Sequence, residues 1–133
     1  MEMQNQIKEY VAQYEKEVRK LADQLRNECM PQPTEELFSE FETNGNRIRY
    51  EAVYFGRRKF LSVLGLASVI WREKEDIQKL EEVIREICAE ECWALPAHVK
   101  RKENPNWRGV IDLFASETGP VSYTHLTLPT IRL

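Results

Sequence analysis

Apolar residues in the first part of the chain recur at steps of three and four, which is the spacing of one face of an α-helix. This stripe predicts a long amphipathic helix over Gln6–Cys29. Its apolar members are Ile7, Tyr10, Val11, Tyr14, Val18, Leu21, Leu25 and Cys29. The spacing also fits about three heptads, the minimum for a coiled coil, and we favour a helix that packs within a bundle.

A proline-containing connector follows this helix. Pro31 and Pro33 predict an extended segment, because proline cannot continue a helix and restricts the residue before it. Thr34 is a predicted N-cap for a short helix over Glu35–Glu42. The segment 44–46, Asn-Gly-Asn, ends that helix, because both residue types tolerate the left-handed conformation.

The third predicted helix follows the polar segment Arg47–Glu51 and ends near Arg72. Its second half is apolar on nearly every side, which indicates a helix surrounded by other helices. Gly56 and Gly65 lower its helix propensity and indicate close approach by another helix.

Two more helices complete the pattern. Asp76 is the predicted cap of a fourth helix over Ile77–Cys92, and a fifth helix starts near Val110 with Asp112 in its first turn. No alternating strand pattern occurs in residues 1–119. The predicted fold class is therefore all-α, built of antiparallel helix pairs with short connections.

The composition changes abruptly at Pro120, which we expect to halt the fifth helix. Residues 120–133 contain one charged side chain, Arg132, and resemble the translation of a sequencing adaptor. We therefore expect residues 120–133 to be a non-native tail and residues 1–119 to be the N-terminal part of a truncated domain. The alternative is a native β-like tail.

A foreign tail has two consequences. Tyr123 and His125 would carry no function, so His98 would be the only native histidine. A truncated helical arc would also expose an apolar patch along the third or fifth helix, and self-association through that face would follow.

Charge and composition narrow the function classes. A net charge of −3 argues against a general nucleic-acid binder, and we interpret the basic clusters 57–59 and 100–102 as solvated faces. No apolar run has the roughly 20 residues that a membrane span needs. The first residues do not resemble a secretory signal, so we expect a cytoplasmic protein.

The cysteines do not predict a disulfide framework or a metal site. Cys29, Cys88 and Cys92 are odd in number, and Cys88, Cys92 and His98 would lack a fourth zinc ligand. We expect the cysteines to be buried small apolar residues, and we expect no metal and no cofactor.

Two blocks of sequence resemble heparinase II/III-like proteins. One block is residues 41–51 with 54–58, and the other is residues 87–98 with 111–118. The resemblance implies a toroid of paired α-helices, here incomplete, with a β-sandwich after it. It also implies a polysaccharide lyase that cleaves uronic-acid-containing glycans by β-elimination. The catalytic residues of the family come mostly from later elements, so the resemblance implies a segment that is inactive alone.

With this resemblance, five residues become candidates for binding an acidic oligosaccharide or polysaccharide: Asn46, Arg49, Tyr50, His98 and Trp107. Elimination needs donors that neutralise the uronate carboxylate and a group that moves the α-proton. Arginine suits carboxylates and aromatic faces suit sugar rings. No catalytic residue is assigned, although His98 is a candidate for a proton-transfer role.

Structural alternatives exist for each candidate. His98 could cap a loop, Trp107 could anchor one, and residues 46–51 could form a network that holds a helix junction. Asp112 and Glu117 fall on different helix faces and do not form a glycosidase pair; Asp112 is better explained as a favourable charge at a helix N-terminus. For the whole protein, the alternatives to a lyase are a helical-repeat scaffold that binds a protein or glycan, and a free-standing helical regulator.

Overall fold

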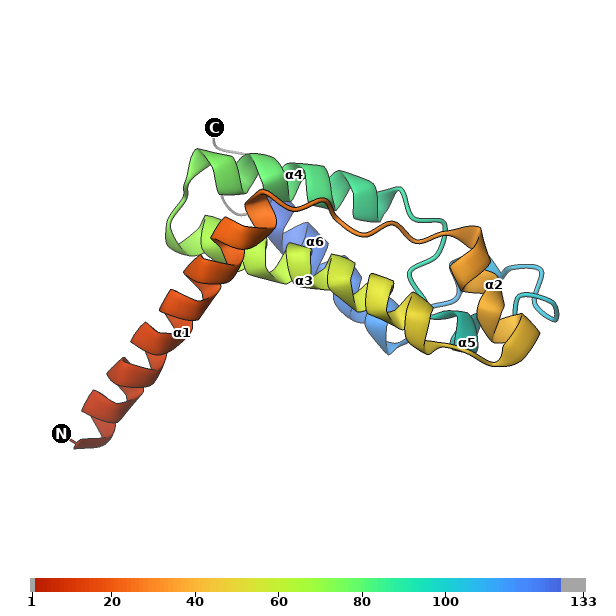
Figure 1. The fold of residues 1–133 in the computed structure, drawn as a ribbon, viewed down its shortest axis with the longest axis horizontal. Helices are drawn as coiled ribbons and strands as arrows, with labels where there is room; N and C mark the ends of the chain where they lie inside the picture. Colours follow the sequence, from red (N-terminus) through yellow and green to blue (C-terminus); the bar gives the residue numbers. More distant parts are fainter. Residues whose placement is uncertain (1, 128–133) are drawn as a thin grey trace.

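The computed structural model describes residues 2–127, and every regular element in that range is helical (Figure 1). The elements are α1 (Glu2–Arg26), α2 (Glu35–Asn44), α3 (Ile48–Ile70), α4 (Lys74–Cys88), α5 (Pro96–Val99), the 3₁₀ turn η1 (Trp107–Gly109) and α6 (Leu113–Thr127). The predicted all-α class is confirmed. None of the helices among the described residues combines the length and the apolar character needed to cross a membrane.

The limits of α2 follow the predicted caps. The Thr34 hydroxyl accepts a hydrogen bond from the Leu37 amide at 3.3 Å, which satisfies one of the free N–H groups of the first turn. Gly45 ends the helix with φ of 75°, in the left-handed region that glycine tolerates. Local chemistry alone therefore sets both ends of α2.

The end of α4 differs from the prediction. The helix stops at Cys88 instead of Cys92. The Trp93 indole N–H donates to the Ile87 carbonyl at 2.8 Å and so satisfies an acceptor in the last turn. The residues after Cys88 form a loop, α5 and η1 in place of a longer helix.

Asp76 is not the cap of α4. The helix starts at Lys74, which puts Asp76 in the first turn, where its side chain is fully buried. The guanidinium groups of Arg19 and Arg26 lie 2.9 Å and 2.8 Å from its carboxylate oxygens. Asp76 therefore joins α1 to α4, and a contact between distant segments replaces the predicted local role.

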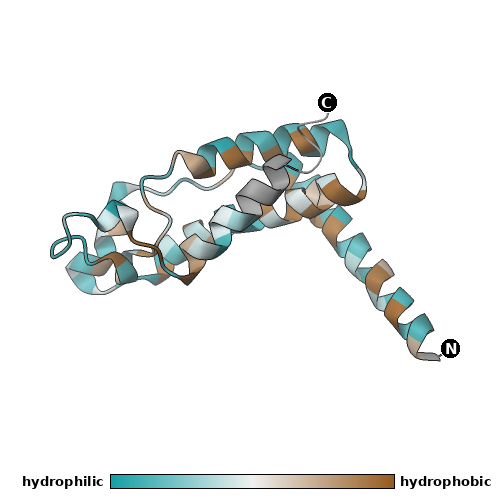
Figure 2. Ribbon diagram, turned by 180° about the vertical axis from the view of Figure 1, so that it is seen from behind, coloured by the Kyte–Doolittle hydropathy of each residue, from teal (hydrophilic) through white to brown (hydrophobic). Residues whose placement is uncertain are grey.

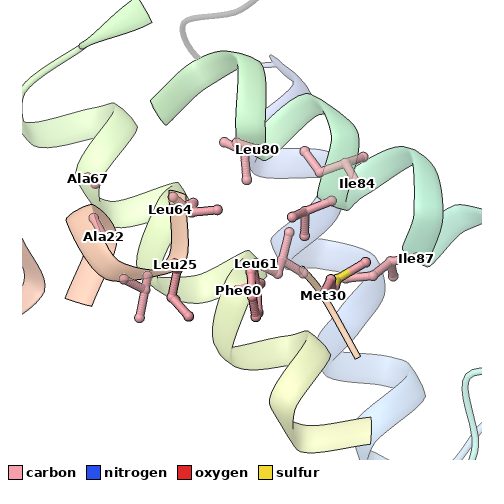
Figure 3. Packing of buried hydrophobic residues seen from close by; sticks show 12 residues of the cluster. Ala22, Leu25, Met30, Phe60, Leu61, Leu64, Ala67, Leu80, Ile84 and Ile87 are labelled. Carbon is pink, nitrogen blue, oxygen red and sulfur yellow. The ribbon is translucent and has the colours of Figure 1, made fainter. Parts of the chain in front are cut away.

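The main core lies where α1, α3 and α4 meet (Figure 3). Its fully or nearly fully buried members are Ala22, Leu25, Met30, Phe60, Leu61, Val63, Leu64, Ala67, Leu80, Val83, Ile84 and Ile87. Burial of each large aliphatic side chain contributes about 1.5–3 kcal/mol before conformational entropy is counted. Helix α3, which was predicted to be surrounded, supplies the largest share of this cluster.

A second core cluster packs α2 and the region of α5 and η1 against the N-terminal half of α3. Its buried members are Phe38, Tyr50, Tyr54, Cys92, Ala94, Leu95, Val99 and Trp107. The Tyr54 hydroxyl donates to the Trp93 carbonyl at 2.7 Å. This cluster holds the segment of α5 and η1 that contains the candidates His98 and Trp107.

The basic cluster at 57–59 is not a solvated face throughout. Arg57 is 1% exposed, and its guanidinium donates to the Pro31 carbonyl at 2.8 Å and to Glu90 at 2.6 Å. Arg58 binds the same Glu90 carboxylate with two nitrogens, each at 2.7 Å. Next to them, a Cβ on Gly56 would lie 3.2 Å from Pro31, so the close approach predicted at Gly56 is by the connector and not by a helix.

Helix α6 continues past Pro120, so the prediction that Pro120 halts it is wrong. Proline in a helix removes one N–H donor and crowds the preceding turn, but neither effect must end the helix. Residues 128–133 and the side chains of 121–127 lie outside the described part. The non-native origin of 120–133 and the absence of a role for Tyr123 and His125 stay predictions.

The N-terminal half of α1 extends away from the rest of the molecule (Figure 1). In the predicted stripe, Val18 and Leu25 are buried and Leu21 is partly buried, whereas Cys29 is exposed and lies beyond the end of α1 at Arg26. The exposed apolar members are Met3, Ile7, Tyr10, Val11 and Tyr14, each at least half exposed. Other exposed apolar residues are Phe55, Val69 and Ile70 on α3, Ile111 just before α6 and Leu113 at its start. The predicted patch at a truncated face stays a prediction.

Candidate functional site

Two of the five sequence candidates belong to the second core cluster. Tyr50 is 6% exposed and Trp107 is 8% exposed, and both contact Phe38, with ring centroids 5.3 Å and 5.4 Å from it. Burial raises the pKa of Tyr50 to about 12, so its hydroxyl stays protonated at neutral pH. Trp107 is buried against Phe38 although the sequence around it is polar, and this position matches the alternative in which it anchors its loop.

Tyr50 and Trp107 line a pocket of about 250 Å³. The charged residues of this pocket are all carboxylates: Glu35, Glu90 and Glu91. Each of them is paired with arginine: Glu35 with Arg101, Glu90 with Arg57 and Arg58, and Glu91 with Arg108.

Asn46 and Arg49 hold the junction between α2 and α3. The Asn46 side-chain oxygen accepts from the Ile48 amide at 3.1 Å. Arg49 forms an ion pair with Glu40, and Arg47 forms one with Glu51. These contacts match the structural alternative for residues 46–51.

His98 is placed differently, because it pairs with a carboxylate and stays accessible. Its Nδ1 lies 2.7 Å from Oδ2 of Asp112, and its side chain is 40% exposed. The Asp112 Oδ2 also accepts from the Leu95 amide at 3.0 Å, and Oδ1 accepts from the Ala115 amide at 2.8 Å. Helix α6 begins at Leu113 and not near Val110 as predicted, so Asp112 caps it from the preceding position and orients His98 at the same time.

The charge state of Asp112 follows from these contacts. Desolvation alone would raise its pKa, but the hydrogen bonds from Ala115, His98 and Leu95 stabilise the carboxylate, and the pKa lies below its usual value. An ionised Asp112 favours the imidazole tautomer with the proton on Nδ1. In that neutral tautomer the Nε2 atom carries the lone pair, so it can accept a hydrogen bond or a proton from a ligand on the exposed side.

Aromatic rings adjoin the imidazole. The Phe114 ring is parallel to that of His98 within 4°, with centroids 6.5 Å apart, and Phe55 meets Phe114 edge-on at 5.1 Å. Phe55 is 42% exposed. Phe55 and Phe114 line a pocket of about 170 Å³ that extends over α3 to Ser62. We call the surface of Phe55, His98, Asp112 and Phe114 the His98 face.

Two cations flank the His98 face without an ion-pair partner among the described residues. Lys59 is exposed one helical turn beyond Phe55, and Lys100 is exposed two residues beyond His98. By contrast, Arg58 is bound by Glu90, and Arg101 is bound by Glu35. Arg58 and Glu117 also line the pocket beside Phe55 and Phe114.

Sequence reasoning missed Phe55, Lys59 and the pairing of His98 with Asp112. Phe55 and Lys59 share the exposed side of α3, which a 3.6-residue period over that helix could have indicated. His98 and Asp112 are 14 residues apart across a loop, and no periodic signal links such positions.

The thiols show no sign of shared chemistry. Cys92 is buried, and burial raises the pKa of its thiol, whereas Cys29 and Cys88 are exposed. In residues 2–127, no group of three or more His, Cys, Asp or Glu side chains could hold a metal ion.

A comparison of the chain with protein-family models, with curated proteins and with solved structures finds no match in any of the three.

Proposed function

We propose that this chain is part of a heparinase II/III-like polysaccharide lyase and that the His98 face contacts an acidic glycan. In this proposal the helices belong to an α/α toroid of antiparallel pairs. The observation that carries it is the pairing of an exposed His98 with the ionised Asp112 beside the Phe55 and Phe114 rings. All four residues fall within the two sequence blocks that resemble the family.

The chemistry of the face suits a uronate-containing ligand. The exposed Phe55 edge offers an apolar contact for a sugar ring, and Lys59 and Lys100 offer charge for its carboxylates. The Nε2 atom of His98 can donate to a carboxylate when protonated, or accept a proton when neutral. His98 is proposed as a ligand-contacting residue; the residues that abstract the α-proton are left unassigned.

Binding can be tested by isothermal titration calorimetry with an oligouronate, using a neutral oligosaccharide of equal length for comparison. We expect saturable binding of the oligouronate only. His98→Gln should weaken it about tenfold, the effect of losing one charge-assisted hydrogen bond. Lys20→Gln on the exposed side of α1 is the matched control and should leave binding unchanged. Equal affinities of wild type and His98→Gln would disprove the assignment.

Lyase activity needs a separate test. A protein that contains this region together with further toroid helices should raise the ultraviolet absorbance of unsaturated uronate when it is given acidic glycans. We expect no such signal from residues 1–133 alone. Absence of the signal across a broad panel of acidic glycans would exclude the lyase while leaving glycan binding open.

A helical scaffold without enzymatic activity is the second candidate. It is favoured by the exposed apolar stripe on α1, which is typical of a surface that meets another protein. A scaffold with a protein partner predicts no oligouronate binding at the His98 face, so the calorimetric titration separates the two proposals.

A further inference from the structure

The exposed half of α1 presents an apolar surface whose flanks carry an uneven charge pattern. At 100° per residue, the exposed Met3, Ile7, Tyr10, Val11 and Tyr14 lie on one side of the helix. Hydrophobic bands recur along the projecting part of α1 (Figure 2). The same stripe continues into Val18, Ala22 and Leu25, which are buried against α3 and α4. A helix that packs one half of a continuous stripe and exposes the other half is suited to pair with a second helix.

The flank charges identify the kind of helix that fits. At 100° per residue, Lys8 and Glu15 border the same edge of the stripe, two turns apart. The opposite edge carries Gln6, Gln13 and Glu17, with Gln13 bonded to Glu17 at 3.3 Å. One edge therefore has a cation and an anion, and the other has no cation.

When two identical helices pair in antiparallel orientation, each edge of the stripe faces the same edge of the other helix. In parallel orientation, each edge faces the other edge of its partner. In the antiparallel arrangement, Lys8 of each helix meets Glu15 of the other. Val11 of each copy then packs against Tyr14 of the other copy. In the parallel arrangement, Lys8 and Glu15 meet Met3 and Tyr10, which offer no opposite charge.

We propose that a second copy of this chain covers the exposed stripe, with the two α1 helices antiparallel and with Lys8 paired to Glu15 of the other copy in two symmetric ion pairs. The two-fold axis passes between Val11 and Tyr14. The register brings Ile7 to the level of Val18 of the other copy. Val18 is followed by Arg19, whose guanidinium lies 4.9 Å from the Trp71 ring, just after α3. Two exposed apolar residues, Val69 and Ile70, precede Trp71 in the sequence. This surface is distinct from the His98 face and does not depend on the proposed function.

The pairing should be of moderate strength. The exposed part of the stripe covers about two heptads, which is the small end of a specific interface. We therefore expect a dimer that dissociates on dilution in the micromolar range.

Charge exchange tests both the partner and the orientation. Sedimentation equilibrium of the whole chain should give a dimer for the wild type. Lys8→Glu alone should weaken dimerisation about tenfold, because it replaces two attractive pairs with two repulsive pairs, and Glu15→Lys alone should do the same. The double variant Lys8→Glu with Glu15→Lys should restore the wild-type dissociation constant, because the pairs form again with the charges exchanged.

The chain supplies a matched control for this exchange. Glu9 and Lys16 have the same residue types and the same spacing, but they lie on the side of α1 opposite the stripe, and both are exposed. Glu9→Lys and Lys16→Glu should leave the dissociation constant unchanged. Circular dichroism checks that each variant keeps its helix content.

Three results would overturn the proposal. The first is a wild-type chain that remains monomeric at high micromolar concentration. The second is a double exchange that fails to restore the dimer that each single exchange weakens, since that result excludes the antiparallel register. The third is equal sensitivity to the Glu9 and Lys16 variants, which would place the interface elsewhere.

Discussion

The roles of several residues in this protein depend on contacts with groups that are distant in the sequence. Asp112 was expected to act as a favourable charge at a helix start, and it does cap α6, but it also pairs with His98. Trp107 lies in a polar stretch of sequence and is nevertheless buried against Phe38. The cap could be predicted because it depends on neighbours within one turn. The pairing and the burial could not, because both depend on contacts between segments far apart in the chain.

Asp112 should make stability depend on pH. Its pKa is lowered in the folded state, so its contribution is present above the unfolded value, about 3.9, and is lost as the pH falls through the folded value. Asp112→Ala should lower the free energy of unfolding by about 1–2 kcal/mol near neutral pH, because it removes the cap and the pairing with His98. Urea denaturation at neutral pH and below about pH 4 measures the effect.

Asp112→Asn is the informative companion, because asparagine caps a helix as well as aspartate does. It should lower the free energy of unfolding less than Asp112→Ala does at neutral pH. It should also make the free energy of unfolding fall less steeply as the pH is lowered. An acid-side slope identical to that of the wild type would show that Asp112 does not supply the pH dependence.

At the scale of elements, helix existence was predictable from the hydrophobic pattern, and helix limits were predictable only where local chemistry decides them. Thr34 and Gly45 set the ends of α2 as expected. The early end of α4 depends on an indole that caps the last turn from the following loop. The burial of Arg57 depends on Glu90 and on the Pro31 carbonyl, so a run of basic residues alone could not indicate it.

The junction of α1 with α4 depends on Asp76. Replacement by alanine would leave Arg19 and Arg26 without their buried carboxylate, and we expect the free energy of unfolding to fall by about 3 kcal/mol. Asp23→Ala is the matched control, since Asp23 also pairs with Arg19 but is largely exposed, and it should cost no more than about 1 kcal/mol. Similar losses in the two variants, measured by urea denaturation, would contradict a special role for the buried carboxylate.

At the scale of the molecule, α3 connects two core clusters and α1 leaves them halfway along its length (Figure 1). The sequence pattern predicted the full stripe of α1, but it could not show where the stripe loses its neighbours, because that depends on how far α3 and α4 extend. The His98 face and the α1 stripe are separate surfaces, so glycan contact and self-pairing can be tested independently.

The projecting half of α1 should respond to protein concentration. An isolated helix of this length is marginal in water, so backbone amides of residues 3–17 should exchange with solvent rapidly in dilute protein. They should become protected at concentrations where the chain dimerises. Hydrogen exchange followed by mass spectrometry reads this directly, and exchange that is independent of concentration would argue against a second copy on the stripe.

The contact between His98 and an acidic glycan is most directly tested by the NMR signals of its imidazole. His98→Gln assigns these signals, because it removes those of His98 and leaves those of His125. Addition of an oligouronate should shift the His98 signals to saturation, and the neutral oligosaccharide should leave them in place. Signals of His98 that do not move while the oligouronate is in excess would contradict the proposed role of the His98 face.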